Sequence, residues 1–189
     1  VESQFKKRKN PARLERQVAS IQRHVIDRLL NGYDLDYDII FDDDGSGEIA
    51  DIVALKTAND NLHIHLFHCK YAHGSEAGVR VGDFYEVCGQ AQKSVHWRSE
   101  IKRLFVRLKL REEQRQRSYN VSRFEKGDLQ KLDELRRRSR VLLPKFHIYI
   151  VQPGLKVIDA KDTVLDLLGA TELYLGETLA VPLTVIASS

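Results

Sequence analysis

The sequence predicts an α/β fold in which a central mixed sheet is flanked by helices. Short apolar or alternating segments typical of strands alternate along the 189-residue chain with longer segments whose apolar residues recur at helical spacing. The first strand segments follow one another closely, as in an antiparallel meander, whereas a helix separates the last two, as in a parallel crossover. No linker rich in Pro, Gly or Ser divides the chain, so we expect a single domain over 1–189.

Composition narrows the classes of function. Charged residues make up 30 % of the chain, the formal net charge is +3 and the sequence pI is about 8.8, so a mildly basic surface permits nucleic acid binding. No apolar run is long enough to cross a membrane, and no secretory signal pattern is found. Two cysteines make no disulfide framework, which favours a cytoplasmic protein. Because the chain starts at Val1 and has no Met, we expect a module of a larger protein.

The first predicted element is a helix over 11–31, which follows a basic segment at 5–13. Its apolar positions are spaced by three and four residues: Leu14, Val18, Ile21, Val25 and Leu29. The Asn-Gly pair at 31–32 is a typical helix end. This helix is expected to pack on the sheet, and Glu15 is the one acid on it that could reach an active site.

Three strands are predicted next, at 37–41, 48–57 and 62–71, and two turns join them into a meander. The acidic segment 42–47, AspAspAspGlySerGly, lacks the ligand spacing of an EF-hand, so we interpret it as a hairpin turn and not as a calcium loop. The segment 58–61, AlaAsnAspAsn, has the composition of a second tight turn.

Helices and strands alternate over the rest of the chain. We predict a helix over 82–98, a basic helical insertion over 99–140, a strand over 145–151, a helix over 160–178 and a strand over 181–186, the last three forming a strand-helix-strand unit over 145–187. The insertion is interpreted as an exposed helical hairpin whose Lys and Arg residues contact nucleic acid, with Arg136, Arg137 and Arg138 as the predicted contacts.

The second hairpin brings ionisable residues together. With Thr57 opposite Leu62, the pairing places Asp51 opposite His68. Successive side chains alternate between faces, so Asp51, His68 and Lys70 share the face that is otherwise apolar. An acid can hold Mg²⁺, and a lysine one pleat away can activate water and offset developing charge. This arrangement favours a metal-dependent phosphodiesterase.

Two other chemistries are weighed against this interpretation. A Cys69 nucleophile is disfavoured because the adjacent His68 points to the opposite face. Zinc could bind His63, His65 and Cys69, with Cys88 beyond, but no CxxC or HxxxH spacing supports it. We therefore interpret His63 and His65 as core or surface histidines.

These elements and motifs resemble the PD-(D/E)xK, or restriction-endonuclease-like, nucleases. The order helix, three-stranded meander, helix, strand covers roughly 11–151. The family acid on the second strand is matched by Asp51, and its (D/E)xK tripeptide is matched by His68-Cys69-Lys70. Many members carry a Gln, sometimes with a Lys or Tyr, on the following helix, and Gln90 with Gln92 and Lys93 resembles that feature.

More narrowly, the strings FHCKY, YEVCGQAQKS, RFEKGDL and IVQPGL are similar to a nuclease-type module at the end of bacterial DEAD/DEAH-box helicase-like proteins, some of them associated with phage defence. The resemblance implies a bacterial, cytoplasmic DNA endonuclease that uses Mg²⁺ or Mn²⁺. It also implies covalently linked helicase or other domains and allows a homodimer. RNA stays open as a substrate.

The resemblance implies catalytic roles for Asp51, His68, Lys70, Gln90 and Lys93, with the metal held by the first two. One departure matters, because His68 stands where the family has Asp or Glu and an imidazole brings no charge to a hard Mg²⁺ site.

Two outcomes follow from this departure. Either a carboxylate from Glu15, Asp83 or Glu86 completes the metal site, or the domain is a catalytically inactive DNA-binding or docking module. The histidine therefore decides between a nuclease and a binding module.

Overall fold

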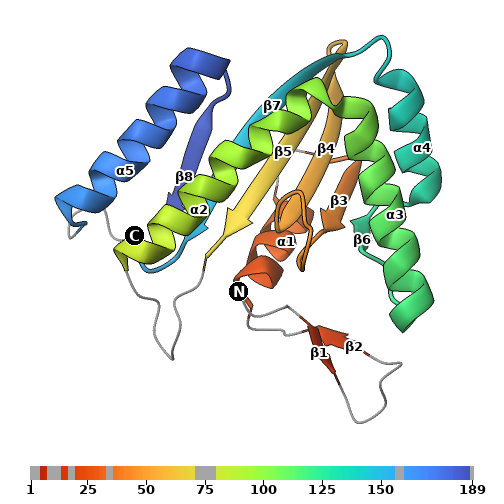
Figure 1. The fold of residues 1–189 in the computed structure, drawn as a ribbon. Coiled ribbons are helices and arrows are strands. Elements are labelled where there is room, and N and C mark those ends of the chain that lie inside the picture. The colour runs from red at the N-terminus through yellow and green to blue at the C-terminus, as the bar shows by residue number, and fades with distance from the viewer. Residues whose placement is uncertain are drawn as a thin grey trace.

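The computed structural model describes residues 5–7, 14–16, 20–32, 36–70, 80–155 and 160–187 and shows an α/β protein. Its centre is a six-stranded mixed sheet with the order β6-β3-β4-β5-β7-β8 (Figure 1). The strands are β3 (Ile39–Asp42), β4 (Ile52–Ala58), β5 (Asn61–Cys69), β6 (Phe124–Lys126), β7 (Leu143–Gln152) and β8 (Leu183–Ala187). The predicted α/β class and the mixed sheet are confirmed.

The predicted meander is present, since β3, β4 and β5 are antiparallel neighbours. Thr57 pairs with Leu62, as the sequence predicts, and the same register continues along the whole hairpin. Asn59 and Asp60 adopt φ values of 47° and 60°, which these residue types tolerate in a tight turn. The pairing of β4 with β5 begins at Ile52, which pairs with Phe67. Asp51 therefore lies one residue outside β4.

The remaining strands are parallel. β7 pairs with β5, and β8 pairs with β7, both in parallel register. The helix α5 (Asp162–Leu173) connects β7 to β8, which confirms the predicted strand-helix-strand unit. Such a crossover requires a helix on one face of the sheet.

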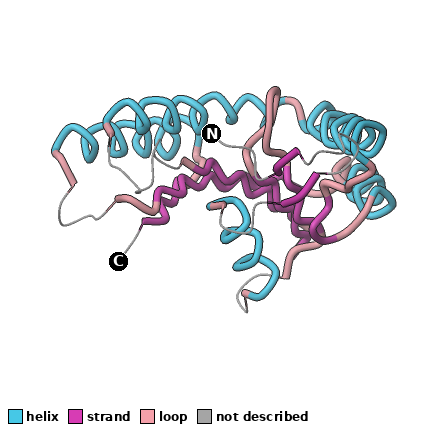
Figure 2. Tube along the Cα trace, turned by 90° about the horizontal axis from the view of Figure 1, so that it is seen from below, coloured by secondary structure: helices cyan, strands magenta, loops and turns pink. Residues whose placement is uncertain are grey.

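Helices cover both faces of the sheet unequally. Figures 1 and 2 show α1 alone on one face and the other helices on the opposite face. The helices besides α5 are α1 (Ile21–Asn31), α2 (Val81–Ser94), α3 (Ile101–Tyr119) and α4 (Leu129–Arg138). No helix in the described part of the chain is long and apolar enough to cross a membrane.

The two faces of the β4–β5 hairpin carry separate apolar cores. The face toward α2 contains the apolar set predicted to share one face: Val53, Leu55, Leu62, Ile64 and Leu66. The face toward α1 contains the alternate positions Ile52, Ala54, Phe67 and Cys69. The predicted apolar side of α2 is buried at all five positions: Phe84, Val87, Cys88, Ala91 and Val95. The alternation of side chains along the strands therefore holds as predicted.

The predicted helix over 11–31 is wrong in its first half. Residues Leu14–Arg16 form a short strand, β2, that pairs antiparallel with β1 (Phe5–Lys7). The helix begins only at Ile21, because the Ser20 side chain accepts a hydrogen bond from the Arg23 N–H at 3.2 Å and caps the first turn.

Smaller boundary differences occur elsewhere. The α-helix predicted over 82–98 ends at Ser94, and a 3₁₀ segment follows at Val95–Ser99. The α-helical part of the segment predicted over 160–178 ends at Leu173, and Tyr174–Thr178 forms a π-helical turn. The insertion over 99–140 contains the two predicted helices but also β6, which adds an unpredicted edge strand beside β3.

Candidate functional site

The loop between β3 and β4 is a compact structure that presents several acids. The Asp43 N–H donates to the Asp51 carbonyl at 3.0 Å, which closes the base of the loop. The Ile49 N–H donates to Asp43 Oδ2 at 2.7 Å inside it. Gly47 has a φ of 79°, and a Cβ at this position would collide with the guanidinium of Arg107.

Arginines from α3 and the following segment hold this loop in place. The buried Arg111 forms an ion pair with Asp43 and donates to the Ser46 carbonyl at 2.9 Å. Arg107 donates to the Gly47 carbonyl at 2.6 Å, and Arg123 donates to the Asp42 carbonyl at 2.8 Å. Part of the basic charge that the sequence predicts for an exposed hairpin or phosphate track is therefore internal scaffolding.

Three carboxylates gather at the end of this loop. Asp44, Glu48 and Asp51 each bring an oxygen within 4.8 Å of the others. All three lie close enough to Cys69, the residue before Lys70, to raise the pKa of its thiol, although burial is the larger cause. The group is therefore at the end of β5 that carries the predicted HxK tripeptide.

Asp51 is the most buried of these three carboxylates, with 1 % of its surface exposed. Its Oδ2 accepts a hydrogen bond from the Cys69 backbone N–H at 2.7 Å. Its Oδ1 is buried without a hydrogen-bond partner in the described part of the chain. Burial, followed by the charge of Glu48, raises the pKa of Asp51 to about 8, against the smaller effect of the Cys69 N–H.

The pKa of Glu48 is raised for similar reasons. Burial is the largest cause that raises its pKa to about 7, and the charges of Asp44 and Asp43 raise it further, although the Gly45 N–H donates to its Oε2 at 2.8 Å and opposes the shift. Clustered buried carboxylates that resist ionisation are relieved by a bound cation. Oxygen donors of this kind fit Mg²⁺ or Mn²⁺.

Two of these three acids are absent from the site that the sequence predicts. Asp44 and Glu48 belong to or follow the acidic run that is interpreted there only as a turn. The available signal is an acid-rich loop directly before the strand expected to carry Asp51. A turn at 42–47 is expected only to join two strands. In the structure this loop also brings Asp44 and Glu48 next to Asp51.

Lys70 is buried and points toward α2. Its exposed fraction is 2 %, and its ammonium forms an ion pair with the half-exposed Glu86 of α2. Glu86 is one of the predicted additional carboxylates, and the structure places it with the lysine and not within the group of three acids. The Lys70 backbone is fixed as well, since its N–H donates to the Val151 carbonyl at 3.0 Å.

His68 is not brought into the carboxylate group. It is buried, and its Nε2 lies 3.2 Å from Ser94 Oγ at the end of α2. Burial alone lowers its pKa to about 4, so the ring is neutral at physiological pH. The predicted role of His68 as a metal ligand is not supported by these contacts, because the carboxylates that cluster with Asp51 come from the preceding loop.

The shared face predicted for Asp51, His68 and Lys70 is correct for the last two residues only. His68 and Lys70 both contact α2. The Asp51 carboxylate instead accepts a hydrogen bond from the Cys69 backbone N–H. The Gln22 side chain of α1 lies close enough to lower the pKa of Asp51. The reason is that Asp51 precedes β4, so strict alternation of side chains no longer applies to it.

The other predicted residues lie around this centre. Gln90 and Lys93 follow Glu86 on one stripe of α2, where Gln90 is half-buried and Lys93 is exposed. Asp83 lies in the first turn of α2, outside the carboxylate group, and its Oδ2 is buried without a partner among the described residues. The Glu15 backbone belongs to β2, and its side chain lies outside the described residues.

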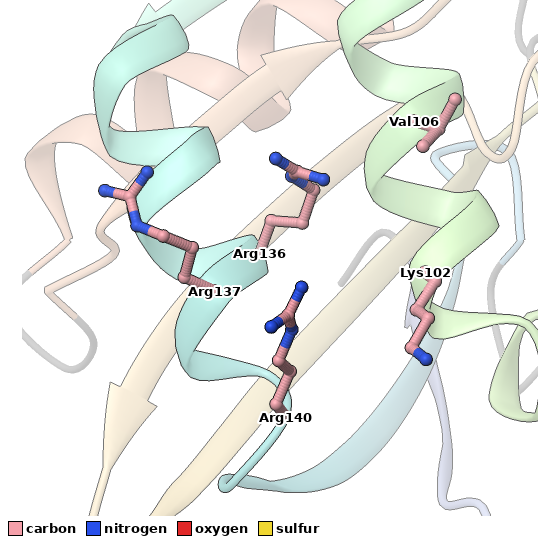
Figure 3. A pocket seen from close by; sticks show the side chains of 5 residues that line it. All are labelled: Lys102, Val106, Arg136, Arg137 and Arg140. Carbon is pink, nitrogen blue, oxygen red and sulfur yellow. The ribbon is translucent and has the colours of Figure 1, made fainter.

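A basic groove runs between α3 and α4 (Figure 3). One hollow of about 130 Å³ is lined by Lys102, Val106, Arg136, Arg137 and Arg140. A second hollow of about 170 Å³ adjoins it through Val106 and Arg136. We call these two hollows the α3–α4 groove. Two of the three predicted arginines line it, but Arg138 instead pairs with Glu134 at 3.4 Å.

No protein-family model, curated protein or solved structure matches this chain. The class of protein is therefore defined by its own fold and site. It is an α/β protein whose six-stranded mixed sheet carries a group of three carboxylates at one end of β4 and β5, and whose buried Lys70 directly follows β5.

Proposed function

We propose that this protein is a metal-dependent nuclease that hydrolyses phosphodiester bonds in DNA. The observation that carries the proposal is the group formed by Asp44, Glu48 and the buried Asp51, whose Oδ1 has no hydrogen-bond partner among the described residues. A buried acidic group with an orphan oxygen is expected where a divalent cation binds. The hydrolysis of a phosphodiester is a reaction that such an ion assists.

The residues have separate roles in this proposal. Asp44, Glu48 and Asp51 hold Mg²⁺ or Mn²⁺. The bound ion supplies Lewis-acid polarisation of the phosphate. Lys70 provides a positive charge that orients water and offsets charge developing on the phosphate, and Glu86 holds its ammonium in position. Gln90 and Lys93 contact the scissile phosphate or its neighbour from the next turn of α2.

The order of the elements supports a PD-(D/E)xK-like core. A helix, an antiparallel meander, a second helix and a parallel strand follow one another as α1, β3-β4-β5, α2 and β7. Asp51 precedes the second strand of the meander, and Lys70 follows its third strand. In this proposal the carboxylate that the tripeptide lacks at His68 is supplied by the loop before β4.

The α3–α4 groove is proposed as a contact for the nucleic acid backbone. Lys102, Arg137 and Arg140 form no ion pair within the described part of the chain, so their charges are available to phosphates. The wider setting that we propose is a bacterial, cytoplasmic module linked to a helicase in a phage-defence protein, with a homodimer as one assembly. RNA is the alternative substrate.

The decisive assay incubates plasmid and linear DNA with the protein in Mg²⁺ or Mn²⁺. Wild-type protein is expected to cleave, and Asp51→Asn and Lys70→Ala are expected to lose cleavage by a factor of about 10² or more. Lys93→Ala is expected to lose less, because its side chain is exposed. Intact DNA with wild-type protein, in both metals, would remove the catalytic claim.

The second candidate is a DNA-binding or docking module without catalysis. One observation favours it, which is the ion pair between Lys70 and Glu86. A lysine ammonium held in an ion pair is less free to act on water. This candidate expects salt-dependent DNA binding that survives Asp51→Asn and weakens when Arg136 and Arg137 are replaced by Gln. RNA and DNA competitors in the same binding assay separate the two polymers.

A further inference from the structure

Three histidines form a cluster on the α1 face of the sheet, away from the carboxylate group. His63 and His65 lie two residues apart on β5, and His147 lies directly beside His65 on the parallel strand β7. One ring nitrogen of each residue lies within 4.8 Å of the other two. Nδ1 of His63 and Nε2 of His147 are 3.1 Å apart.

The sheet itself produces this convergence. Residues i and i+2 of a strand face the same side, and a paired residue on a neighbouring strand lies about 4.8 Å away. His63 and His65 of β5 are paired with both β4 and β7, and His147 of β7 is paired with β5, so the backbones at all three positions are held by the sheet before any ion binds. The cluster is therefore preorganised at the level of the main chain.

The rings are also in the protonation state that a metal requires. Burial is the largest cause that lowers the pKa of each of the three, to about 3 in the case of His65. Neutral imidazole offers a lone pair without first releasing a proton. His63 and His147 are only half-buried, so an ion can reach them from solvent.

We propose that His63, His65 and His147 form a binding site for a borderline transition-metal ion, with Zn²⁺ as the expected occupant. Three imidazoles with an open position are a donor set that suits Zn²⁺, Ni²⁺, Cu²⁺ and Co²⁺. The positive charges of Lys56 and Lys145, which also lower the pKa of His63, repel a bound cation. Only a cation that binds imidazole strongly overcomes this repulsion. The site therefore discriminates against Mg²⁺, which the carboxylate group prefers.

A neighbouring tyrosine orients one ligand. Nδ1 of His65 lies 3.0 Å from the Tyr149 hydroxyl, which leaves its Nε2 for another partner. The rings of His65 and His147 are stacked at 4.4 Å with an interplanar angle of 11°. Because ligand lone pairs lie in the ring planes, binding requires the half-buried rings of His63 and His147 to turn toward a common point.

The zinc set that is weighed and disfavoured from the sequence has Cys69 as the third ligand on this face. The structure groups His63 and His65 with His147 instead. Cys69 lies four residues beyond His65, where its backbone N–H bonds to Asp51 and its side chain packs in the α1 core. Spacing does not assign His147, because it comes from a strand far along the chain.

The experiment measures metal binding in tag-free protein that carries Asp51→Asn, which removes the other site. Equilibrium dialysis against Zn²⁺ is expected to give one ion per chain. Co²⁺ is expected to give visible absorption bands of an imidazole-bound ion. His63→Ala or His147→Ala is expected to weaken Zn²⁺ binding roughly tenfold or more. His24→Ala, which removes a histidine of α1, is expected to change nothing.

Unchanged Zn²⁺ affinity in folded His63→Ala protein would overturn the proposal, as would the absence of Zn²⁺ binding before any substitution. Circular dichroism checks the fold of each variant. His63 is the decisive position, because its ring is half-exposed and its loss leaves the core intact. If His147→Ala unfolds, His63→Ala alone decides, and a Zn²⁺-dependent rise in Tm that it abolishes gives a second readout.

Discussion

The carboxylate of Asp51 accepts a hydrogen bond from the backbone N–H of Cys69 at 2.7 Å and leaves its other oxygen without a partner in the described part of the chain. The pairing of β4 with β5 begins at Ile52 and Phe67, so this bond lies just beyond the end of the ladder. Asp51 thus ties the start of β4 to the end of β5 within the group that it forms with Asp44 and Glu48.

Asp51→Asn is expected to stabilise the protein while it abolishes metal binding. An Asn oxygen can still accept from Cys69, and the amide is neutral without the proton that the buried carboxyl must take up at neutral pH when the chain folds. We expect a gain of about 1–3 kcal/mol in the free energy of unfolding, or roughly 2–10 °C in Tm. Thermal unfolding with and without Mn²⁺ measures both effects.

The matched control for this substitution is Asp133→Asn, which changes an acid of α4 outside the metal site. It is expected to leave the Mn²⁺-dependent rise in Tm intact. Destabilisation by Asp51→Asn, with Mn²⁺ still raising its Tm, would contradict the assignment of Asp51 as a strained ligand.

The stability of metal-free protein is expected to fall as pH rises from about 4 to about 8 through the contribution of Asp51. In the unfolded chain this carboxyl has its ordinary pKa of 3.8, whereas the folded protein keeps the proton until about pH 8. The unfolded state therefore binds fewer protons over that window, and the free energy of unfolding declines with pH. The difference in stability between Asp51→Asn and wild type should grow over the same window in urea titrations, and saturating Mn²⁺ should flatten it.

His68→Asn is expected to separate the sequence prediction from the structural one. If the imidazole were a ligand, Mn²⁺ binding would be lost. The structure instead buries His68 against Ser94, so the substitution should lower the free energy of unfolding by about 1–3 kcal/mol and leave Mn²⁺ affinity within a factor of about three. Isothermal titration with Mn²⁺ at a temperature where the variant is folded makes the comparison.

Patterns local in sequence predict the register of the β4–β5 hairpin, although they miss the edge strand β6. The register of the β4–β5 hairpin follows from its short turn and from the alternation of apolar and polar side chains along each strand. Both signals involve residues that are close in the sequence. The apolar stripe of α2 is equally local, and its five members are buried. The start of α1 differs from the prediction because a single N-cap at Ser20 outweighs an apolar spacing that continues upstream.

The candidate site is predicted less completely because its contacts are long-range. Asp51 and Lys70 can be found from the hairpin alone. The burial of Arg111 against Asp43, which folds the acidic loop over the end of the sheet, joins residues far apart in the chain. Charge density does not distinguish that arginine from the exposed arginines of α4. Asp44 and Glu48 consequently carry no local signal that they approach Asp51.

Arg111→Lys is expected to loosen the acidic loop. The guanidinium contacts the Asp43 carboxylate and the Ser46 carbonyl together, and an ammonium cannot reproduce that forked geometry. We expect a loss of about 2–4 kcal/mol in the free energy of unfolding and weaker Mn²⁺ binding. Arg103→Lys, on the exposed side of the same helix, should change stability by less than about 0.5 kcal/mol. Equal effects of the two substitutions in urea titrations would refute the scaffolding role.

Replacing Lys102, Arg137 and Arg140 together by Gln is expected to weaken DNA binding without loss of stability. These cations line the α3–α4 groove and form no ion pair within the described residues, so their replacement breaks no ion pair there. If each contacts one phosphate, the slope of log K against log salt concentration should become less negative by roughly 2–3. Arg138→Gln, which removes an arginine paired with Glu134 outside the groove, should leave that slope unchanged. Fluorescence anisotropy with a labelled duplex over a range of salt concentrations measures both, and equal slopes for the triple variant and wild type would place the DNA elsewhere on the protein.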